Sequence, residues 1–409
     1  MIPYKKIVFK NFFNLSLNQG FNIIATIIYT PIIFQKLGSE SFGQIHLAFS
    51  ILILLSVITS YGYNFNGSVK IAESKNSLEE KSVLSEILYL RIILSFFIFL
   101  TSIPLINYFF DENFVKILIF SFTILLSEAI NPMFFFQGKN NLFPQAIINF
   151  FSKSIYIVLI VYLINGSNDD YLVNFFYGTS ICVFFSIYWI YYLVRSRLIK
   201  IKFSFNKLIL NLKNNFQFFL SSVSSHITVN SILIILSFFE SNKVLGEFTL
   251  AFKIAFILRM FPVFYFQSLL QKATTLNIIS KSKFHNFINK TFYLGLVITL
   301  LISFFVFIFS SELIELFAGE KVDYSTHILT ILSVIPFLAM LNVKNVIYIL
   351  INDYKDTLNK ATFCTLIFML IFSLFFTNLY GGVGIAYALI LTEIFALLIH
   401  YILLNKRNE

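Results

Sequence analysis

The sequence is poor in charge, in cysteine and in tryptophan. Asp, Glu, Lys and Arg make up 12% of its 409 residues, whereas a soluble domain normally carries about 25%. This shortage excludes an ordinary soluble globule. The two cysteines, Cys182 and Cys364, both lie in apolar runs, so they predict neither a disulfide nor a metal site.

Signatures of catalysis are also missing. The sequence has no Gly-rich phosphate loop that ends in Lys and Ser or Thr, so we do not expect direct use of ATP. Its five histidines are scattered without the spacing of metal ligands. We therefore expect no enzymatic activity, no cofactor and no metal. In a soluble protein, a net charge of +10 would suggest a nucleic-acid partner. Here basic cytoplasmic loops explain the charge, so no nucleic-acid partner is expected.

Long apolar runs are what the sequence does contain, since 58% of its residues are hydrophobic. A membrane-spanning helix needs about 20 such residues in succession. Runs this long and this uniformly apolar exclude the alternating strands of a membrane barrel. We therefore predict an all-α polytopic membrane protein of about twelve transmembrane helices. The predicted spans are residues 12–34, 42–63, 87–110, 114–136, 144–165, 171–194, 215–239, 245–270, 291–309, 325–351, 361–378 and 383–404.

The distribution of charge predicts the orientation of these helices. Lys and Arg concentrate in the connections that are cytoplasmic when the N-terminus is inside, and acidic residues such as Asp111, Glu112 and Glu320 fall in the opposite loops. Cytoplasmic loops of membrane proteins carry an excess of Lys and Arg. Both termini are therefore predicted to lie in the cytoplasm.

A basic cytoplasmic linker at residues 195–214 divides the sequence into an N-terminal lobe, 1–194, and a C-terminal lobe, 215–409. Each lobe would hold six helices, and an even number gives both lobes the same orientation. The predicted architecture is therefore two parallel six-helix lobes related by pseudo-two-fold symmetry. Four residues that open the second predicted helix recur at a constant offset in the eighth: Gly43, Leu47, Ala48 and Phe49 correspond to Gly246, Leu250, Ala251 and Phe252.

Polar side chains follow one face of the first helix of each predicted lobe, in steps of three and four residues. One interpretation is hydrogen bonding between helices, which contributes about 0.6 kcal/mol per contact. The other is a hydrated central cavity. The residues are Asn14, Asn18 and Asn22 in the first helix and Gln217, Ser221 and Ser225 in the seventh.

Ionisable residues lie deep in several apolar runs, although a charge at the bilayer centre costs at least about 2.5 kcal/mol. Lys344 is close enough to a helix end to reach water. Glu128 and Lys153 lie on adjacent predicted helices. An alternative role for them is to form a structural ion pair with each other. Lys253 and Arg259 have no acidic residue beside them in the sequence, so they are expected to attract an anion such as phosphate. The full set is Glu128, Lys153, Lys253, Arg259, Lys344 and Glu393.

Short motifs follow one another along nearly the whole sequence. They are residues 18–20, 31–43, 61–63, 71–72 and 136–138 in the first half, and Gly246, Phe248, Ala251 and Lys253 with Phe317, Gly319 and Glu320 in the second. In this order they resemble the O-antigen or polysaccharide-unit flippases of the multidrug/oligosaccharidyl-lipid/polysaccharide exporter superfamily. The sequence departs from that pattern at Phe134, where the family often has Trp, and at 139–141, where an acidic residue often follows.

The resemblance implies a flippase of the bacterial inner membrane whose substrate is a polyprenyl-diphosphate-linked oligosaccharide. By alternating access, the lobes would move the headgroup outward while its prenyl tail stays in membrane lipid. Polysaccharide polymerase machinery is a candidate partner. In this hypothesis Lys153, Lys253 and Arg259 hold the diphosphate. The stripe residues Asn14, Asn18, Asn22, Gln217, Ser221 and Ser225 meet sugar hydroxyls, and Glu128 and Glu393 carry a coupling proton or sodium ion.

Two alternatives stay open at this point. A multidrug exporter of the same superfamily would be expected to carry an excess of acidic residues in its cavity. A membrane-embedded glycosyl polymerase would need an external catalytic region. The short outer loops make this alternative less favourable.

Overall fold

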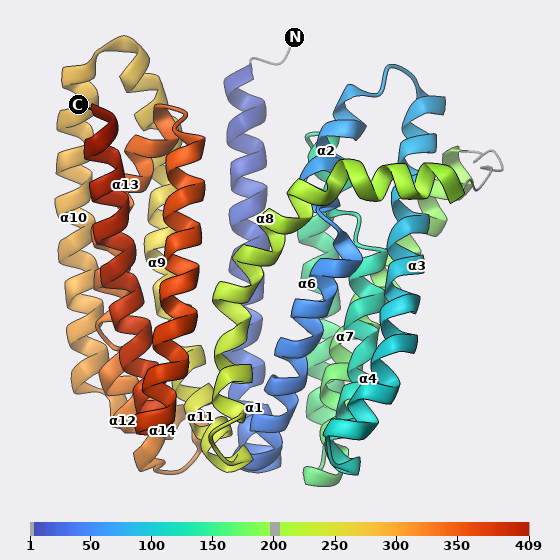
Figure 1. Cartoon of the computed structure of the whole chain (residues 1–409), viewed down its shortest axis with the longest axis vertical. Coiled ribbons are helices and arrows are strands. Elements are labelled where there is room, and N and C mark those ends of the chain that lie inside the picture. The colour runs from blue at the N-terminus through green and yellow to red at the C-terminus, as the bar shows by residue number, and fades with distance from the viewer. Residues whose placement is uncertain (1–3, 197–204, 409) are drawn as a thin grey trace. The chain divides into compact units, whose positions relative to one another are not determined.

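The computed structural model describes residues 4–196 and 205–408 (Figure 1), and within these residues it is helical with no strand. Residues 197–204 of the predicted linker therefore lie outside the described residues, and its last ten residues, 205–214, belong to a helix. The helices are α1 (Tyr4–Ser60), α2 (Tyr63–Glu73), α3 (Ser77–Phe109), α4 (Glu112–Ala129), α5 (Met133–Gly138), α6 (Phe143–Leu163), η1 (Ser167–Asp169), α7 (Asp170–Ser196), α8 (Phe205–Ser237), α9 (Asn242–Ile279), α10 (Lys281–Ile308), α11 (Ser310–Ala318), α12 (Asp323–Leu332), α13 (Ile335–Ile351) and α14 (Lys355–Asn408).

The helices form two compact units, Met1–Ser231 and Ile232–Glu409. In the first unit α4 packs against α1, α3 and α7, and α6 packs against α1 and α7. In the second unit α13 packs against α9, α10 and α14, and α12 packs against α9. The boundary between the units falls within α8. The predicted lobes, with their symmetry and their linker at 195–214, stay a prediction.

Eight helices of the described chain are long and apolar enough to cross a membrane, or nine if the bent pair within α8 is one span. The chain is therefore a multi-pass membrane protein, as its composition predicted. Two of the eight are much longer than a bilayer is thick: α1 has 57 residues and α14 has 54. The predicted count of twelve stays a prediction.

Both long helices contain a break at a glycine. Gly38 in α1 has φ 76° and Gly381 in α14 has φ 57°, and a glycine enters this left-handed region without the clash that a Cβ would cause. Gly38 falls between the first two predicted spans and Gly381 between the last two. Each break therefore lies where the sequence predicts the chain to turn back.

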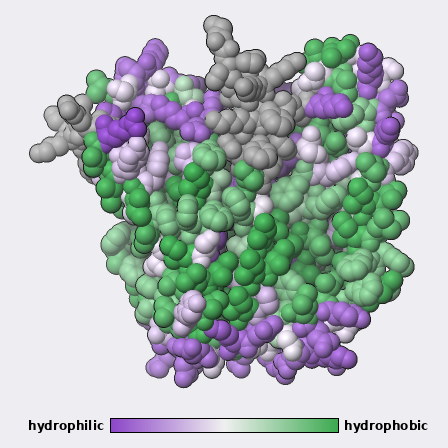
Figure 2. All heavy atoms as spheres, turned by 180° about the vertical axis from the view of Figure 1, so that it is seen from behind, coloured by the Kyte–Doolittle hydropathy of each residue, from purple (hydrophilic) through white to green (hydrophobic). Residues whose placement is uncertain are grey.

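Apolar side chains cover the outside of the helices as well as their packed faces. On α10, for example, Leu301 and Phe304 are each 61% exposed. On the face drawn in Figure 2, hydrophobic side chains gather along the middle of the helices and hydrophilic ones toward their ends. An exposed apolar surface of this extent marks contact with a membrane.

Candidate functional site

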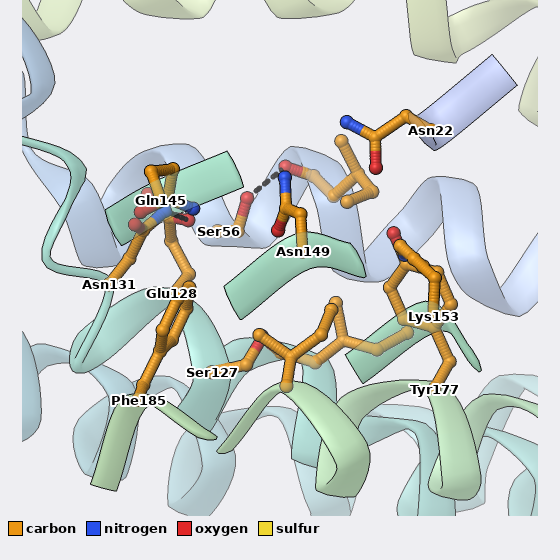
Figure 3. A pocket seen from close by; sticks show the side chains of 13 residues that line it. Asn22, Ser56, Ser127, Glu128, Asn131, Gln145, Asn149, Lys153, Tyr177 and Phe185 are labelled. Atoms are coloured by element: carbon orange, nitrogen blue, oxygen red, sulfur yellow. Dashed lines mark hydrogen bonds between the residues drawn. The ribbon is translucent and has the colours of Figure 1, made fainter. Parts of the chain in front are cut away.

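A cavity of about 200 Å³ lies in the first unit, among α1, α4, α6 and α7 (Figure 3). Four apolar side chains line it, Ile53, Ile124, Ile181 and Phe185. The rest of its lining is polar or charged: Asn22 and Ser56 from α1, Ser127 and Glu128 from α4, Asn131 from the turn after α4, Gln145, Asn149 and Lys153 from α6, and Tyr177 from α7.

Helix α6 supplies three of these side chains from one face. Gln145, Asn149 and Lys153 are spaced by four residues, so they lie one above another on the helix surface. All three are nearly inaccessible, at 5%, 9% and 6% exposure. Because α6 packs against both α1 and α7, this polar face points into the unit and away from lipid.

The asparagine stripe of the first predicted helix meets this face of α6. Asn149 donates a side-chain hydrogen bond to the Asn18 amide oxygen, which is a contact of the interhelical kind. Asn22, one turn further along α1, lines the cavity. Neighbouring members of one stripe therefore lie in different environments: Asn18 in a hydrogen bond between helices and Asn22 at a cavity within the first unit. The predicted central cavity stays a prediction. The side chain of Asn14 lies outside the described part of the structure.

Glu128 is held by two amides. Asn64 donates to its Oε1 at 3.0 Å and Asn131 donates to its Oε2 at 2.9 Å. The Arg91 guanidinium donates in turn to the Asn64 side-chain oxygen at 2.8 Å and to the Asn131 carbonyl at 3.3 Å. The carboxylate is thus connected to a cation through neutral amides, and Arg91 is completely buried.

Sequence reasoning missed Arg91, the cation of this network, along with both of its amides. Arg91 lies near the start of the predicted span 87–110, where an arginine is expected to reach cytoplasmic water. The structure instead places its guanidinium 4.7 Å from the ring centroid of Phe134. The available signal was an arginine already inside an apolar run, together with an amide, Asn64, just after the second predicted span.

Lys153 lies among aromatic rings at the other side of the cavity. Its ammonium is 3.4 Å from the centroid of Tyr177, a favourable cation–π geometry. Tyr177 makes edge-on contacts with Tyr156 and with Phe49, each at 5.3 Å between centroids. A lysine in this position brings a positive charge to the cavity from within the membrane region. Figure 3 shows Lys153 beside Tyr177 and away from Glu128.

In the second unit, Arg259 of α9 donates through Nε to Glu393 Oε1 of α14 at 2.6 Å. The expectation that Arg259 has no acidic partner is therefore wrong. The two residues are 134 positions apart, so nothing in the local sequence could pair them. Lys253 is half-buried on the same helix, six residues before Arg259.

The polar residues predicted on the seventh helix fall on α8. The Gln217 side chain is exposed, and those of Ser221 and Ser225 lie outside the described part of the structure. Nearby, Ser222 and Thr228 donate to backbone carbonyls four residues earlier in α8, a common way to satisfy a hydroxyl within a helix. The described part of α8 therefore gives no evidence for or against a cavity lining.

Among the described residues, no three His, Cys, Asp or Glu side chains come together in a way that could hold a metal ion. The chemistry of the cavity is instead recognition: amides, hydroxyls, one carboxylate and one ammonium in a confined space, with apolar side chains between them. Such a site can bind and orient a polar molecule. It brings together four sequence-predicted residues: Asn22, Glu128 and Lys153 in the lining, with Asn18 bonded behind Asn149.

A family model described as "Polysaccharide biosynthesis protein" matches residues 8–270 of the chain. The chain is 24% identical over 406 residues to a "Putative O-antigen transporter" of Escherichia coli (strain K12), covering 97% of each protein. It is also 26% identical over 247 residues to a protein of the same description from Shigella dysenteriae, covering 60% of this chain and 62% of that protein.

Solved structures share the fold at lower identity. An inward-facing multidrug resistance MATE family transporter of the MOP superfamily superposes with a TM-score of 0.71 at 14% identity, over 97% of this chain and 98% of the other. The lipid II flippase MurJ, in an inward closed conformation, superposes with a TM-score of 0.72 at 17% identity, over 96% and 87%. The predicted helical membrane fold is confirmed.

Proposed function

This chain belongs to the polysaccharide biosynthesis protein family, and from that premise we propose that it is a flippase. It moves a polyprenyl-diphosphate-linked oligosaccharide from the cytoplasmic to the outer face of the bacterial inner membrane. The family match confirms the resemblance found in the sequence motifs. The names of the relatives, an O-antigen transporter and a lipid II flippase, support a transporter that is not an enzyme.

The observation that carries the proposal is the cavity of the first unit. Lys153 is only 6% exposed and lies in a helix of the membrane region. Burying a charge there costs free energy, so such a residue marks a functional path more often than a structural site. Lys153 is suited to the diphosphate because its ammonium is a compact point charge. The amides around it are suited to sugar hydroxyls, since each amide both donates and accepts hydrogen bonds.

The second unit contributes an ion pair that the substrate can open. In this proposal the diphosphate competes with Glu393 for Arg259, whose guanidinium binds phosphate oxygens in a bidentate geometry. Glu393 is then free to take up a proton or sodium ion, which gives transport a coupling step. The predictions that Glu128 also carries a coupling ion, and that Lys153 shares one substrate with Lys253 and Arg259, stay predictions.

Alternating access is the proposed mode of transport, because the headgroup must cross while the prenyl tail stays in lipid. The excess of Lys and Arg in one set of loops supports cytoplasmic termini. Polysaccharide polymerase machinery remains a candidate partner on the outer face.

The test is a measurement of sidedness in cells whose surface polysaccharide depends on this protein. Lys153→Ala is expected to trap lipid-linked units on the cytoplasmic face at a normal protein level. The matched control is Lys344→Ala, since Lys344 lies in another predicted span and donates to Asn289 at 2.9 Å. Normal export by the Lys153 variant would overturn the proposed role of Lys153.

Deletion of the gene separates the alternatives. Loss of a flippase leaves lipid-linked units inside, whereas loss of a glycosyl polymerase leaves single units exposed outside. Loss of a multidrug exporter would leave the lipid-linked units correctly distributed and would instead raise sensitivity to drugs.

A further inference from the structure

A buried acceptor in the wall of the first-unit cavity has no hydrogen-bond partner among the residues that the structure describes. The side-chain oxygen of Gln145, Oε1, makes no hydrogen bond within the structure, although the residue is only 5% exposed and lines the cavity. Buried polar atoms are almost always bonded, so an orphaned one needs an explanation such as a missing ligand. Figure 3 shows Gln145 in the wall of the cavity, beside Glu128.

Other polar groups of the lining also present acceptors to the cavity. Ser56 and Ser127 donate their hydroxyl protons to carbonyls of their own helices, each at 2.7 Å, which leaves only oxygen lone pairs to offer. Glu128 accepts one described side-chain hydrogen bond at each oxygen, and each carboxylate oxygen can accept more than one. The cavity therefore suits a ligand that brings several donors.

The size of the cavity indicates how much of a ligand it can hold. A cavity of about 150 Å³ holds a benzene ring, and a water molecule occupies about 30 Å³. At about 200 Å³, the cavity is much larger than a single ion requires and accommodates one six-membered ring with its hydroxyls. Apolar side chains such as Ile124 and Phe185 line the space between the polar groups, where they can contact the C–H faces of such a ring.

We propose that this cavity is a subsite for a single uncharged sugar ring, whose hydroxyls donate to Gln145 Oε1 and to Glu128. The inference rests on the proposed function, because it takes the ring from the lipid-linked oligosaccharide. Gln145 is then a specificity-determining residue. A site built to hydrogen-bond a hydroxyl rejects strongly the analogue that lacks it, since its own buried group is left unpaired.

Trp189, the single tryptophan, provides a native reporter of this subsite. It lies one helical turn after Phe185 on α7, and its Nε1 donates to the Ile130 carbonyl at 2.7 Å. Ile130 immediately precedes Asn131, which lines the cavity. A ring that enters the cavity is therefore expected to change the tryptophan fluorescence of the purified full chain.

The experiment titrates the purified protein with geranyl diphosphate and with geranyl diphosphate linked to glucose, galactose or N-acetylglucosamine. We expect at least one sugar-linked probe to bind about tenfold more tightly than geranyl diphosphate alone. Gln145→Leu is expected to abolish that advantage while still binding geranyl diphosphate. The matched control is Gln267→Leu, because Gln267 also has an unbonded side-chain oxygen but lies in the second unit; it should keep the advantage.

The outcomes separate the two claims. If every sugar-linked probe binds the wild-type protein only as well as geranyl diphosphate, or if Gln145→Leu keeps the advantage, the sugar subsite is wrong and the flippase proposal survives. If the wild type binds neither geranyl diphosphate nor any sugar-linked probe, the proposed function itself fails. Misfolding of the Gln145 variant is not expected, because the replacement removes a buried side-chain oxygen that has no described hydrogen bond to lose; its thermal midpoint is measured alongside.

Discussion

Arg91 and Glu128 carry opposite charges at the two ends of one asparagine side chain. The Arg91 guanidinium donates to the oxygen of the Asn64 amide at 2.8 Å, and the nitrogen of the same amide donates to Glu128 at 3.0 Å. The amide dipole is therefore oriented by both charges, and α2 is tied to α3 and α4. This arrangement keeps a carboxylate at the cavity of the first unit without direct contact from the cation that compensates it.

The bridge predicts a specific loss of stability. Asn64→Leu is expected to lower the free energy of unfolding by about 3 kcal/mol, because hydrogen bonds to charged groups contribute about 1.5 to 3 kcal/mol each and both ions lose one. Thermal unfolding of the purified protein in detergent measures the change. Asn230→Leu is the control, since the Asn230 amide donates to a carbonyl of its own helix. Equal shifts in the two variants would show that the bridge has no special role.

Removing the charge of Glu393 from the Arg259–Glu393 pair is expected to have opposite effects on substrate binding and on transport. Glu393→Gln is expected to strengthen binding of geranyl diphosphate about tenfold, or about 1.4 kcal/mol, because Arg259 no longer has to leave a charged partner. Export should nevertheless slow, since a glutamine at this position cannot take up the proton or sodium ion that the proposed coupling step requires. Binding is measured on purified protein and export by the sidedness assay.

The same pair supplies its own control. Arg259→Ala should weaken binding and abolish export at a normal protein level, and Arg259→Lys should restore the charge but only part of the binding, because Lys cannot make the bidentate contact. Unchanged affinity in all three variants would remove the pair from substrate binding.

Replacing Lys36 is expected to lower the stability of the protein without changing its preference for sugar-linked probes. The Lys36 ammonium donates to the carbonyls of Val161 at 2.6 Å and Ile164 at 2.8 Å, at the C-terminal end of α6. These carbonyls have no partner inside the helix, and a cation there also complements the helix dipole. Lys36→Ala is expected to lower the free energy of unfolding by about 1 kcal/mol, measured as a lower thermal midpoint.

Helix α6 carries Gln145, Asn149 and Lys153. The Lys36→Ala variant therefore tests whether the contact of Lys36 with the end of α6 acts only on stability. The preference for sugar-linked probes should stay unchanged, and Lys321→Ala, at an exposed position, should alter neither quantity. A changed preference would mean that Lys36 positions the cavity rather than only stabilising the helix.

Lys139 belongs to the stretch 139–141, where the sequence departs from the pattern of the family it resembles, and the structure gives it an acidic partner. It forms an ion pair with Glu80, which also accepts from the Tyr192 hydroxyl at 3.1 Å. Lys139→Glu is expected to destabilise the protein by about 0.5 to 1 kcal/mol, within the range of partly exposed pairs. Adding Glu80→Lys should recover the loss. Thermal midpoints of the single and double variants check this, and a double variant no more stable than the single one would contradict it.

Much of the architecture was predictable because it depends on composition and period. Apolar length required membrane helices, and steps of three and four residues placed Asn18 and Asn22 on one face of α1. The same spacing rule, applied to Gln145, Asn149 and Lys153, could have identified the polar face of α6 beforehand. Only Lys153 was predicted from that face, since a charge in an apolar run is conspicuous whereas two amides are not.

The sequence by itself therefore determined the solvent of this protein and the faces of its helices, because hydrophobicity and helical period are local properties of the chain. Only the tertiary structure decided which charges meet. Arg259 binds Glu393, which lies 134 positions further along the chain. Arg91 is connected to Glu128 through Asn64. Gln145 has a side-chain oxygen without a described hydrogen bond at a cavity. These outcomes depend on how helices pack side by side, since hydrogen bonds and ion pairs act over a few ångströms of space whatever the separation along the chain.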